Sequence, residues 1–196
     1  MNKEELITIL QGYSFDRSII VAFNKVDRKK FVPKAYQNFA YENRALPIGF
    51  EQTISQPFTI AFMLKHLDLK NGQKILEVGS GSGYVLALIN EIAKDSEIYA
   101  TERIPELVTR SQDMLNDIHN IKIFQSEDEL GLKKYAPYDR ILVSAAAEEL
   151  PRELIDQLKD NGRMVCPVQD SIVKTQMRDG EPLSESYYGF SFVPLI

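Results

Sequence analysis

The feature that most constrains the fold is a glycine-rich segment that directly follows an apolar run. Residues 75–78 read Ile-Leu-Glu-Val, and Gly79, Gly81 and Gly83 then occur at alternate positions. Glycine tolerates positive φ and has no Cβ, so a ligand can approach its backbone closely. We therefore expect a strand that ends in a tight loop, followed by a helix over residues 83–94.

The spacing of the glycines distinguishes this loop from the dinucleotide-binding fingerprint. That fingerprint is G-x-G-x-x-G, and here Tyr84 occupies the position of its last glycine. A plain strand-to-helix turn needs only one glycine, so three of them after Glu77 favour a ligand-binding loop. The pattern E-x-G-x-G-x-G resembles the loop with which S-adenosylmethionine-dependent methyltransferases surround their cofactor.

Strand and helix patterns alternate after residue 70, which predicts an α/β protein with a mostly parallel sheet and helices on both faces. The expected strands cover residues 74–78, 97–101, 121–124, 139–144 and 162–168, and the expected helices cover 83–94, 105–117 and 150–159. Residues 176–196 predict a hairpin with its turn at Asp179-Gly180 and its return strand over 187–195. By resemblance, a parallel sheet that ends in an antiparallel hairpin is typical of the class I methyltransferase (Rossmann-like) fold.

The first part of the chain has a different character. Helical spacing covers residues 3–12 and 15–27, an aromatic and irregular stretch covers 36–56, and Pro57 is placed to open a helix through about Leu67. The irregular stretch is long for a connector, which indicates a functional segment. We expect one domain over residues 1–196, with a helical and substrate-loop extension over 1–56 and a cofactor-binding core over 57–196.

Composition narrows the possible partners. The net charge of −5 disfavours nucleic acid, because non-specific affinity for it depends on clustered Lys and Arg. The short basic run Arg28-Lys29-Lys30 is expected to be a solvated helix end. The single cysteine, Cys166, and the lack of Cys/His spacing predict no metal site. Without a leader or a long apolar run, we expect no membrane partner and a cytoplasmic location.

Three groups of acids follow expected strands. Glu77 is placed to hold the ammonium of an amino-acid ligand, directly or through water. Glu102 lies about twenty residues after the loop, which suits a carboxylate that accepts from two ribose hydroxyls, although an exposed loop acid has the same appearance. In this fold the adenine edge meets the end of the third strand, where Glu127 and Asp128 occur; a solvated acidic loop is the alternative reading.

Several further segments make the match specific, and with them the chain resembles the protein-L-isoaspartate O-methyltransferase family. The segments are Phe31-Val32-Pro33, Leu46-Pro47-Ile48-Gly49, Gln52-Thr53-Ile54-Ser55-Gln56-Pro57, Ala136-Pro137-Tyr138-Asp139 and Phe192-Val193-Pro194-Leu195. The chain departs from the family at Ser126-Glu127-Asp128, where Gly-Asp-Gly is usual, at Asn43-Arg44, and at Leu132, where an aromatic residue is common.

The resemblance implies an enzyme that transfers a methyl group from S-adenosylmethionine to the free carboxylate of isoaspartyl residues in damaged proteins. The products are S-adenosylhomocysteine and an ester that starts repair through a succinimide. The implied residues are Ser55 as the catalytic residue, Ile48, Thr53, Ile54, Gln56, Ala145, Ala146 and Val193 for substrate, and Glu77, Gly79, Ser80, Gly81, Ser82, Gly83, Glu102, Arg103, Glu127 and Asp128 for cofactor.

Alternatives stay open at this point. Without the resemblance, Ser55 would be read as a cap of the helix that Pro57 opens. The strand that ends at 192–195 is expected to pair with an extended peptide by strand addition. A carboxyl methyltransferase specialised for another peptide aspartate would keep the same core, and so would a cofactor-binding homologue that has lost turnover. A methyltransferase of the same fold that acts on RNA or on a small molecule is a further alternative, and the low positive charge and the segment Thr53-Ile54-Ser55-Gln56-Pro57 count against RNA.

Overall fold

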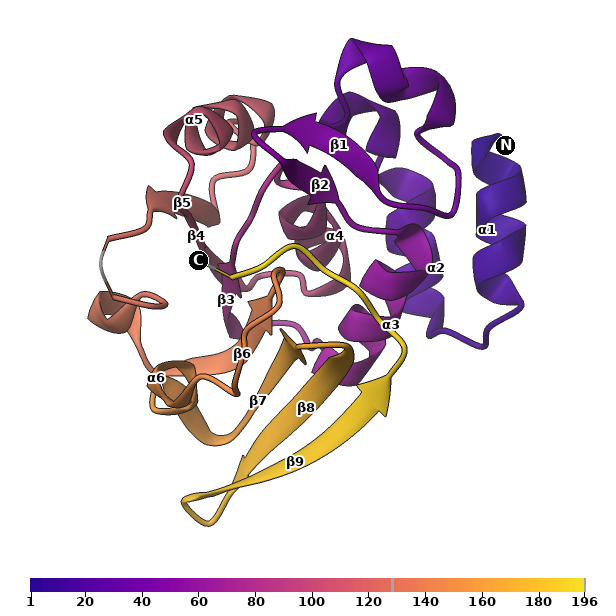
Figure 1. The fold of residues 1–196 in the computed structure, drawn as a ribbon. Coiled ribbons are helices and arrows are strands. Elements are labelled where there is room, and N and C mark those ends of the chain that lie inside the picture. The colour runs from indigo at the N-terminus through magenta and orange to yellow at the C-terminus, as the bar shows by residue number, and fades with distance from the viewer. Residues whose placement is uncertain (128, 196) are drawn as a thin grey trace.

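The computed structural model describes residues 1–127 and 129–195, and a seven-stranded sheet runs through the centre of the chain (Figure 1). The strand order is β5-β4-β3-β6-β7-β8-β9; the first five are parallel, and β8 and β9 are antiparallel. The strands are β3 (Lys74–Val78), β4 (Glu97–Glu102), β5 (Ile121–Gln125), β6 (Tyr138–Val143), β7 (Leu158–Val168), β8 (Ser171–Arg178) and β9 (Glu181–Tyr188). The predicted α/β fold class is confirmed.

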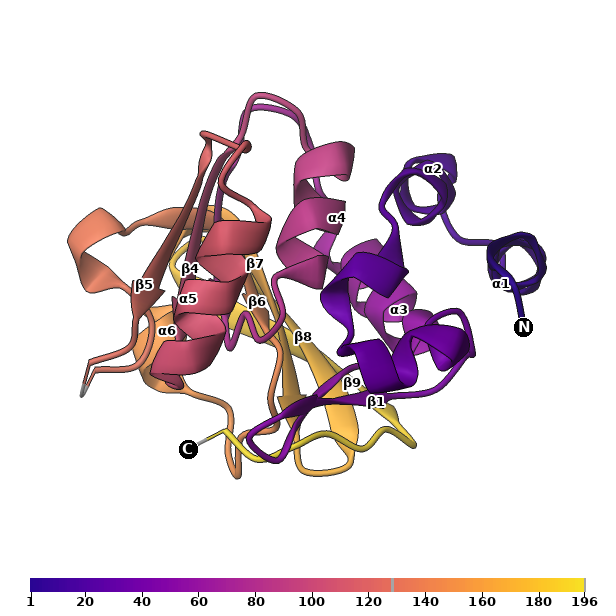
Figure 2. The same ribbon diagram turned by 90° about the horizontal axis from the view of Figure 1, so that it is seen from above.

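Helices cover the two faces of the sheet unequally. One face carries α3 (Pro57–Leu67), α4 (Tyr84–Ile92) and α5 (Pro105–Met114), with α1 (Lys3–Gln11) and α2 (Arg17–Lys25) forming a further layer outside α3 and α4 (Figure 2). The other face is covered by the short α6 (Arg152–Ile155) and the 3-10 turn η3 (Lys133–Tyr135). Two more 3-10 turns, η1 (Arg28–Phe31) and η2 (Lys34–Phe39), link α2 to the next segment.

The side-chain alternation of β3 decides which way its residues point. Leu76 and Val78 pack into the core on the α6 face, whereas Ile75 packs into the core beneath α3 and α4. Because successive side chains of a strand point to opposite faces, Glu77 shares the α3 and α4 face with Ile75. This orientation later determines which cavity Glu77 reaches.

The stretch over 36–56, expected to be irregular, contains a small hairpin. Strand β1 (Leu46–Gly49) pairs antiparallel with β2 (Gln52–Ile54), and the turn residues Phe50 and Glu51 have φ of 55° and 59°. Arg110 of α5 donates from Nη1 to the carbonyl oxygen of Ile48 at 2.7 Å. The hairpin is thereby fastened across the carboxyl end of the sheet.

Two sequence predictions about the later elements are wrong in extent. The predicted turn at Asp179-Gly180 is present, but its return strand is β9 and not residues 187–195. A two-residue turn brings Glu181 directly opposite Arg178, so pairing begins at once, and Gly189 at φ of 95° marks the end of the strand. The polar and exposed residues of β9 gave no apolar alternation that would reveal an edge strand.

The second prediction that is wrong in extent is the helix expected over 150–159. It ends at Ile155 because Leu158 already pairs with Tyr138 of β6, and Lys159 forms an ion pair with Asp139 at 2.7 Å. These contacts draw residues 158–161 into β7 and leave α6 one turn long.

Among the described residues, no helix combines the length and the apolar character that crossing a bilayer requires. Within residues 1–127 and 129–195, no group of three or more His, Cys, Asp or Glu side chains is arranged to hold a metal ion.

Candidate active site

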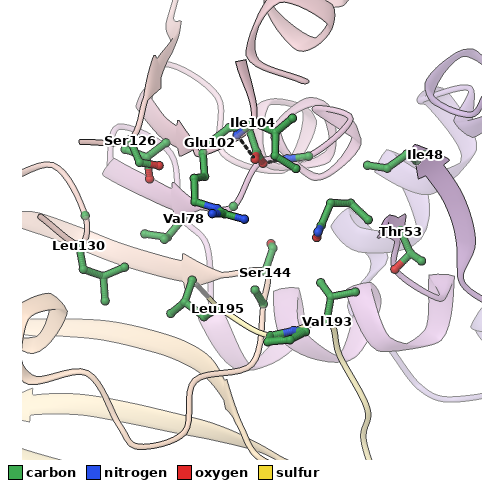
Figure 3. Close-up of a pocket in the computed structure, with 18 of the residues that line it drawn as sticks. Ile48, Thr53, Val78, Glu102, Ile104, Ser126, Leu130, Ser144, Val193 and Leu195 are labelled. Carbon is green, nitrogen blue, oxygen red and sulfur yellow. Dashed lines mark hydrogen bonds between the residues drawn. The ribbon is translucent and has the colours of Figure 1, made fainter. Parts of the chain in front are cut away.

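A cavity of about 480 Å³ opens at the carboxyl ends of four parallel strands (Figure 3). Val78, Glu102, Ser126 and Ser144, at the ends of β3, β4, β5 and β6, all line it. The chain leaves β3 in one direction for β4 and β5 and continues on its other side with β6, so the cavity lies where the strand order reverses. Ligands of open α/β sheets bind at this kind of crevice, and the volume suits a small organic molecule.

Glu102 anchors the rim of this cavity. Its Oε2 accepts from the backbone N–H of Gly81 at 2.8 Å, and its Oε1 accepts from the backbone N–H of Ile104 at 3.0 Å. The residue is 7% exposed, so the alternative reading as an exposed loop acid is wrong. Each carboxylate oxygen has a second lone pair, and these remain available to a pair of hydroxyl groups.

The three glycines of the loop are needed for different physical reasons. All have positive φ, 82° at Gly79, 52° at Gly81 and 79° at Gly83. Gly79 and Gly81 line the large cavity, and a Cβ on Gly81 would lie 3.3 Å from Cδ1 of Ile48. A Cβ on Gly83 would lie 3.0 Å from Cδ1 of Leu115, outside the cavities around the loop. Gly83 is therefore explained by packing against α5.

Glu77 lies under the loop, away from the large cavity. Its side chain is fully buried, its Oε1 accepts from the Ser144 hydroxyl at 2.7 Å, and its Oε2 has no partner among the described residues. Burial raises the pKa of Glu77 to about 8. Glu77 lines a small cavity of about 40 Å³, and so does Ser80, whose hydroxyl has no partner in the described part of the chain. A cavity of this size has room for about one water molecule.

Ser55 lies between β2 and α3, at the meeting of two hollows. It lines the small cavity, and it also lines a groove of about 620 Å³ between residues 43–45 and the C-terminal segment 188–193. Helix α3 begins at Pro57 with Gln56 as its N-cap and no side-chain cap bond, so capping does not account for Ser55. Thr53 and Val193 line both the groove and the large cavity, so the two hollows adjoin.

The structure brings most of the predicted site residues to these hollows. The large cavity is lined by Ile48, Thr53, Gly79, Gly81, Glu102, Arg103, Glu127, Ala145 and Val193. The small cavity is lined by Thr53, Ile54, Ser55, Glu77, Gly79, Ser80, Gly81 and Ser82, and the groove by Thr53, Ser55, Gln56 and Val193. Ala146 and Gly83 line none of the three, and Asp128 lies outside the described residues.

Ala146 has a different partner, and this corrects the expected edge strand over 192–195. Its backbone N–H donates to the carbonyl oxygen of Val193 at 2.8 Å, and its carbonyl accepts from Leu195 at 2.7 Å. These bonds occupy the Val193 carbonyl and the Leu195 N–H, so pairing with a peptide stays a prediction for the other backbone edge of the tail. The tail instead closes one side of the large cavity, as the positions of Val193 and Leu195 show (Figure 3).

Sequence reasoning missed several residues of the site. Thr101, Ile104 and Leu195 line the large cavity. Thr101 and Ile104 flank the acid at the end of an expected strand, and that position could have indicated them; no local signal indicates Leu195. The prediction of a solvated helix end is wrong for Arg28, which is 1% exposed.

An open, mostly parallel sheet with a three-glycine loop at its switch point and an acid ending the next strand defines a class I methyltransferase fold. A precorrin-6y C5,15-methyltransferase from Geobacter metallireducens shares this fold, with a TM-score of 0.53 at 19% identity over 71% of this chain and 87% of that chain. A solved protein-L-isoaspartate O-methyltransferase matches with a TM-score of 0.90 at 24% identity, covering 99% of this chain and 66% of that chain.

The family follows from the sequence comparisons. The model of the family described as protein-L-isoaspartate(D-aspartate) O-methyltransferase matches residues 1–196. A protein-L-isoaspartate O-methyltransferase from Fervidobacterium nodosum is 45% identical over 193 residues, which cover 95% of this chain and 97% of that protein. One from Methanothrix thermoacetophila is 43% identical over 203 residues, covering 100% and 95%. The chain belongs to the protein-L-isoaspartate O-methyltransferase family.

A related solved structure shows what this fold accommodates. The protein-L-isoaspartate O-methyltransferase from Plasmodium falciparum, in complex with S-adenosyl-L-homocysteine, matches with a TM-score of 0.87 at 26% identity over 100% of this chain and 99% of that chain. The predicted family and class of enzyme, an S-adenosylmethionine-dependent protein carboxyl methyltransferase, are confirmed.

Proposed function

We propose that this chain methylates the free carboxylate of isoaspartyl residues in damaged proteins and peptides, with S-adenosylmethionine as the donor, and so starts their repair through a succinimide. One observation carries the proposal. A groove of about 620 Å³ adjoins the cavity of about 480 Å³ through Thr53 and Val193, and Ser55 lies between this groove and the small cavity under the glycine loop. Neither a small-molecule methyltransferase nor a simple cofactor-binding module requires such a groove.

The residues around the large cavity fit the cofactor. Gly81 leaves room that a side chain would fill, and Glu102 faces the cavity with free lone pairs. We assign the ribose hydroxyls to Glu102, with Arg103 beside it, and the adenine amino group to Glu127. Glu127 has the same charge as the aspartate that is usual in the family at this position, and its side chain is longer by one methylene. Glu77 reaches the amino-acid end only through the small cavity, so we assign it a water-mediated contact.

When bound, S-adenosylmethionine supplies a methyl group on a positively charged sulfur. The acceptor is a carboxylate with a reference pKa of about 4, so it is ionised at neutral pH and needs no general base. The chain must align the methyl group with the carboxylate oxygen, and in favourable cases such alignment lowers the reaction barrier by about 7–11 kcal/mol. The Ser55 hydroxyl donates to the acceptor carboxylate, and Thr53, Ile54 and Gln56 form the surrounding wall.

The groove is suited to the rest of the peptide. Phe58, Phe190 and Phe192 line it, together with residues 43–45. Aromatic surfaces contact many kinds of side chain, so they suit substrates that share an isoaspartyl linkage and little else. We propose that the peptide lies here in extended form, with Ile48 and Ala145 closing the end at the acceptor.

The proposed function also indicates the binding partners of the protein and the roles of the two parts of its domain. We propose proteins and peptides as the partners, not nucleic acid, membranes or a metal ion, and a cytoplasmic location. The net charge of −5 supports the exclusion of nucleic acid, since 28 Asp and Glu outnumber the 23 Lys and Arg that could neutralise phosphates. Within one domain, residues 1–56 contribute the β1–β2 hairpin and Ser55 on the substrate side, and residues 57–196 contribute the cofactor cavity.

The decisive experiment offers labelled S-adenosylmethionine and two peptides that differ only in an isoaspartyl or a normal aspartyl linkage. We expect label in the isoaspartyl peptide alone, as a base-labile ester. Label in the aspartyl peptide would support a specialised carboxyl methyltransferase. Binding of S-adenosylhomocysteine by calorimetry, with label in neither peptide, would support either a carboxyl methyltransferase specialised for another peptide or a cofactor-binding homologue without turnover.

A further inference from the structure

Arg28 is buried although its sequence neighbours are not. It begins η1 and is 1% exposed, while Lys29 and Lys30 beside it are exposed. Arginine is almost never fully buried unless it is paired, because removing its charge from water is costly. Within residues 1–127 and 129–195, however, no carboxylate contacts the guanidinium, and its Nη1 has no partner.

The partners of Arg28 are backbone carbonyl groups and an aromatic ring. Its Nε donates to the carbonyl of Ala40 at 2.9 Å, and its Nη2 donates to the carbonyl of Ser55 at 2.9 Å, with Ile54 at 3.5 Å. The guanidinium also lies over the ring of Tyr84, 5.1 Å from its centroid. One side chain thus joins the end of η2, the Ser55 segment and the residue that follows the glycine loop.

The charge of Arg28 persists in this position. Asp27, the nearest acid in sequence, is turned toward the Tyr41 hydroxyl at 2.6 Å and the Lys29 backbone at 3.0 Å. Burial lowers the pKa of Arg28 to about 10, so it remains protonated at neutral pH. A buried cation that is balanced by carbonyl dipoles and an aromatic ring, without a carboxylate, costs stability, and such groups are retained at some functional sites.

The Ser55 carbonyl is the group that this arrangement fixes. Ile54 pairs with Leu46 in the hairpin, and α3 begins at Pro57, so Ser55 lies in the short link between two anchored elements. The planar fork of arginine can hold two carbonyls at set angles, which the single ammonium of lysine cannot do. We propose that Arg28 is a positioning residue that holds the Ser55 hydroxyl in register with the glycine loop. The proposal rests on the proposed role of Ser55.

A double-mutant cycle tests the assignment. We measure kcat and KM for an isoaspartyl peptide in wild type, Arg28→Lys, Ser55→Ala and the double variant. Because small misplacements at a reacting centre are costly, we expect Arg28→Lys to lower kcat about tenfold or more when Ser55 is present. In the Ser55→Ala background the same change should lower kcat less than about twofold, because coupled residues are not additive. Affinity for S-adenosylhomocysteine, measured by calorimetry, should stay within about threefold.

A half-buried arginine provides the control. Arg163 of β7 also donates to a backbone carbonyl, that of His66 at 3.1 Å, and it pairs with Asp68 at 3.7 Å, but it lies away from the site hollows. Arg163→Lys should lower the midpoint of urea unfolding and leave kcat unchanged. If Arg28→Lys is not recovered folded, Arg28→Gln, which keeps one donor group, takes its place in the cycle.

The outcomes separate the two proposals. A loss of kcat by the same factor in both backgrounds, or a loss of stability with full kcat, would overturn the role of Arg28 and leave the proposed function intact. Full kcat in Ser55→Ala would overturn the positioning role together with the role of Ser55. A wild-type protein that binds S-adenosylhomocysteine but methylates no isoaspartyl peptide would overturn the proposed function itself.

Discussion

The carboxylate of Glu102 and the backbone N–H of Gly81 are joined by a 2.8 Å hydrogen bond, which ties the end of β4 to the glycine loop. The other oxygen of Glu102 holds the backbone of Ile104 at the start of α5. One buried acid therefore sets the shape of the loop before any ligand arrives. A preorganised site of this kind binds more tightly, because its ordering cost is met during folding.

Replacing Glu102 with glutamine should weaken cofactor binding. The NH₂ of the new amide would face a backbone N–H, so two donors would meet. The variant would also lose the negative charge that orients the ribose hydroxyl groups. Hydrogen bonds to charged groups are worth about 1.5–3 kcal/mol, so the Kd for S-adenosylhomocysteine should rise about 10- to 100-fold in calorimetry. Glu129→Gln is the control, because Glu129 lines the same cavity but pairs with Lys133. An equal loss in both variants would mean that net charge, and not the tie to the loop, is responsible.

The Ser55 hydroxyl should matter for turnover and little for cofactor binding. We expect Ser55→Ala to lower kcat for an isoaspartyl peptide about 10- to 100-fold, since it removes one hydrogen bond to a charged acceptor. The Kd for S-adenosylhomocysteine should change less than about threefold, because a mutation at a separate contact is nearly additive. Ser191→Ala removes a hydroxyl from another residue of the groove and should retain full kcat. Unchanged turnover in Ser55→Ala would remove this residue from the site.

Glu77 should make the stability of the protein fall as the pH rises. Its pKa is raised from 4.5 to about 8 by burial, so the folded state holds the proton that the unfolded state releases. The stabilisation from this proton is complete below pH 4.5 and is lost as the pH rises through 8. Each pKa unit corresponds to about 1.4 kcal/mol, so the loss between pH 5 and 8 should amount to a few kcal/mol.

The Glu77→Gln variant isolates this contribution. Its amide oxygen can still accept from Ser144, as the protonated acid does, but it does not titrate. Urea unfolding of the variant between pH 5 and 8 should therefore depend on pH more weakly than that of wild type. Glu149→Gln, a change at an exposed acid, should leave the wild-type slope in place. Parallel slopes for wild type and Glu77→Gln would contradict a buried, protonated Glu77.

Two glycines with nearly the same φ should respond differently to substitution. Gly131 has φ of 87° and Gly180 has φ of 81°. A Cβ on Gly180 would meet nothing within 4 Å, so Gly180→Ala should cost only the left-handed penalty of about 1–2 kcal/mol. A Cβ on Gly131 would lie 2.6 Å from Leu154 Cδ2 and from Gln157 Nε2.

Gly131→Ala should therefore cost about 1–3 kcal/mol more than Gly180→Ala, because overpacking adds to the backbone penalty. The Gln157 side chain has little room to yield, since its amide holds the backbone of Leu130 and Leu132 at 2.9 Å. Urea unfolding of the two variants measures the difference directly. Equal losses would show that the loop around Gly131 relaxes freely.

Much of the core was predictable because its determinants are local. The strand at 74–78 coincides with β3, and the other parallel strands differ from prediction by a few residues at their ends. Each of these strands and helices carries its own local pattern of apolar residues, so the sequence alone reveals it. The antiparallel β9 escaped prediction because its residues are nearly all exposed, so no burial pattern marks it.

The site was predictable where residues follow strand ends and unpredictable where distant segments converge. Glu102 was correctly indicated as a cavity residue because the carboxyl ends of parallel strands meet at one edge of the sheet. The contact of Val193 and Leu195 with Ala146 joins segments about fifty residues apart, and no local pattern encodes such pairing. The same limit explains why Leu195 was missed.

The sequence by itself determined the class of protein, because three glycines at alternate positions after a strand are best explained by a loop that surrounds a small ligand. Only the tertiary structure decided where two charged groups lie. Pleating of β3 turns Glu77 toward α3 and away from the large cavity, and carbonyl groups from two separate segments, at Ala40 and at 54–55, surround Arg28. The burial of a charge depends on dipoles that the whole fold brings together, so no run of adjacent residues could reveal it.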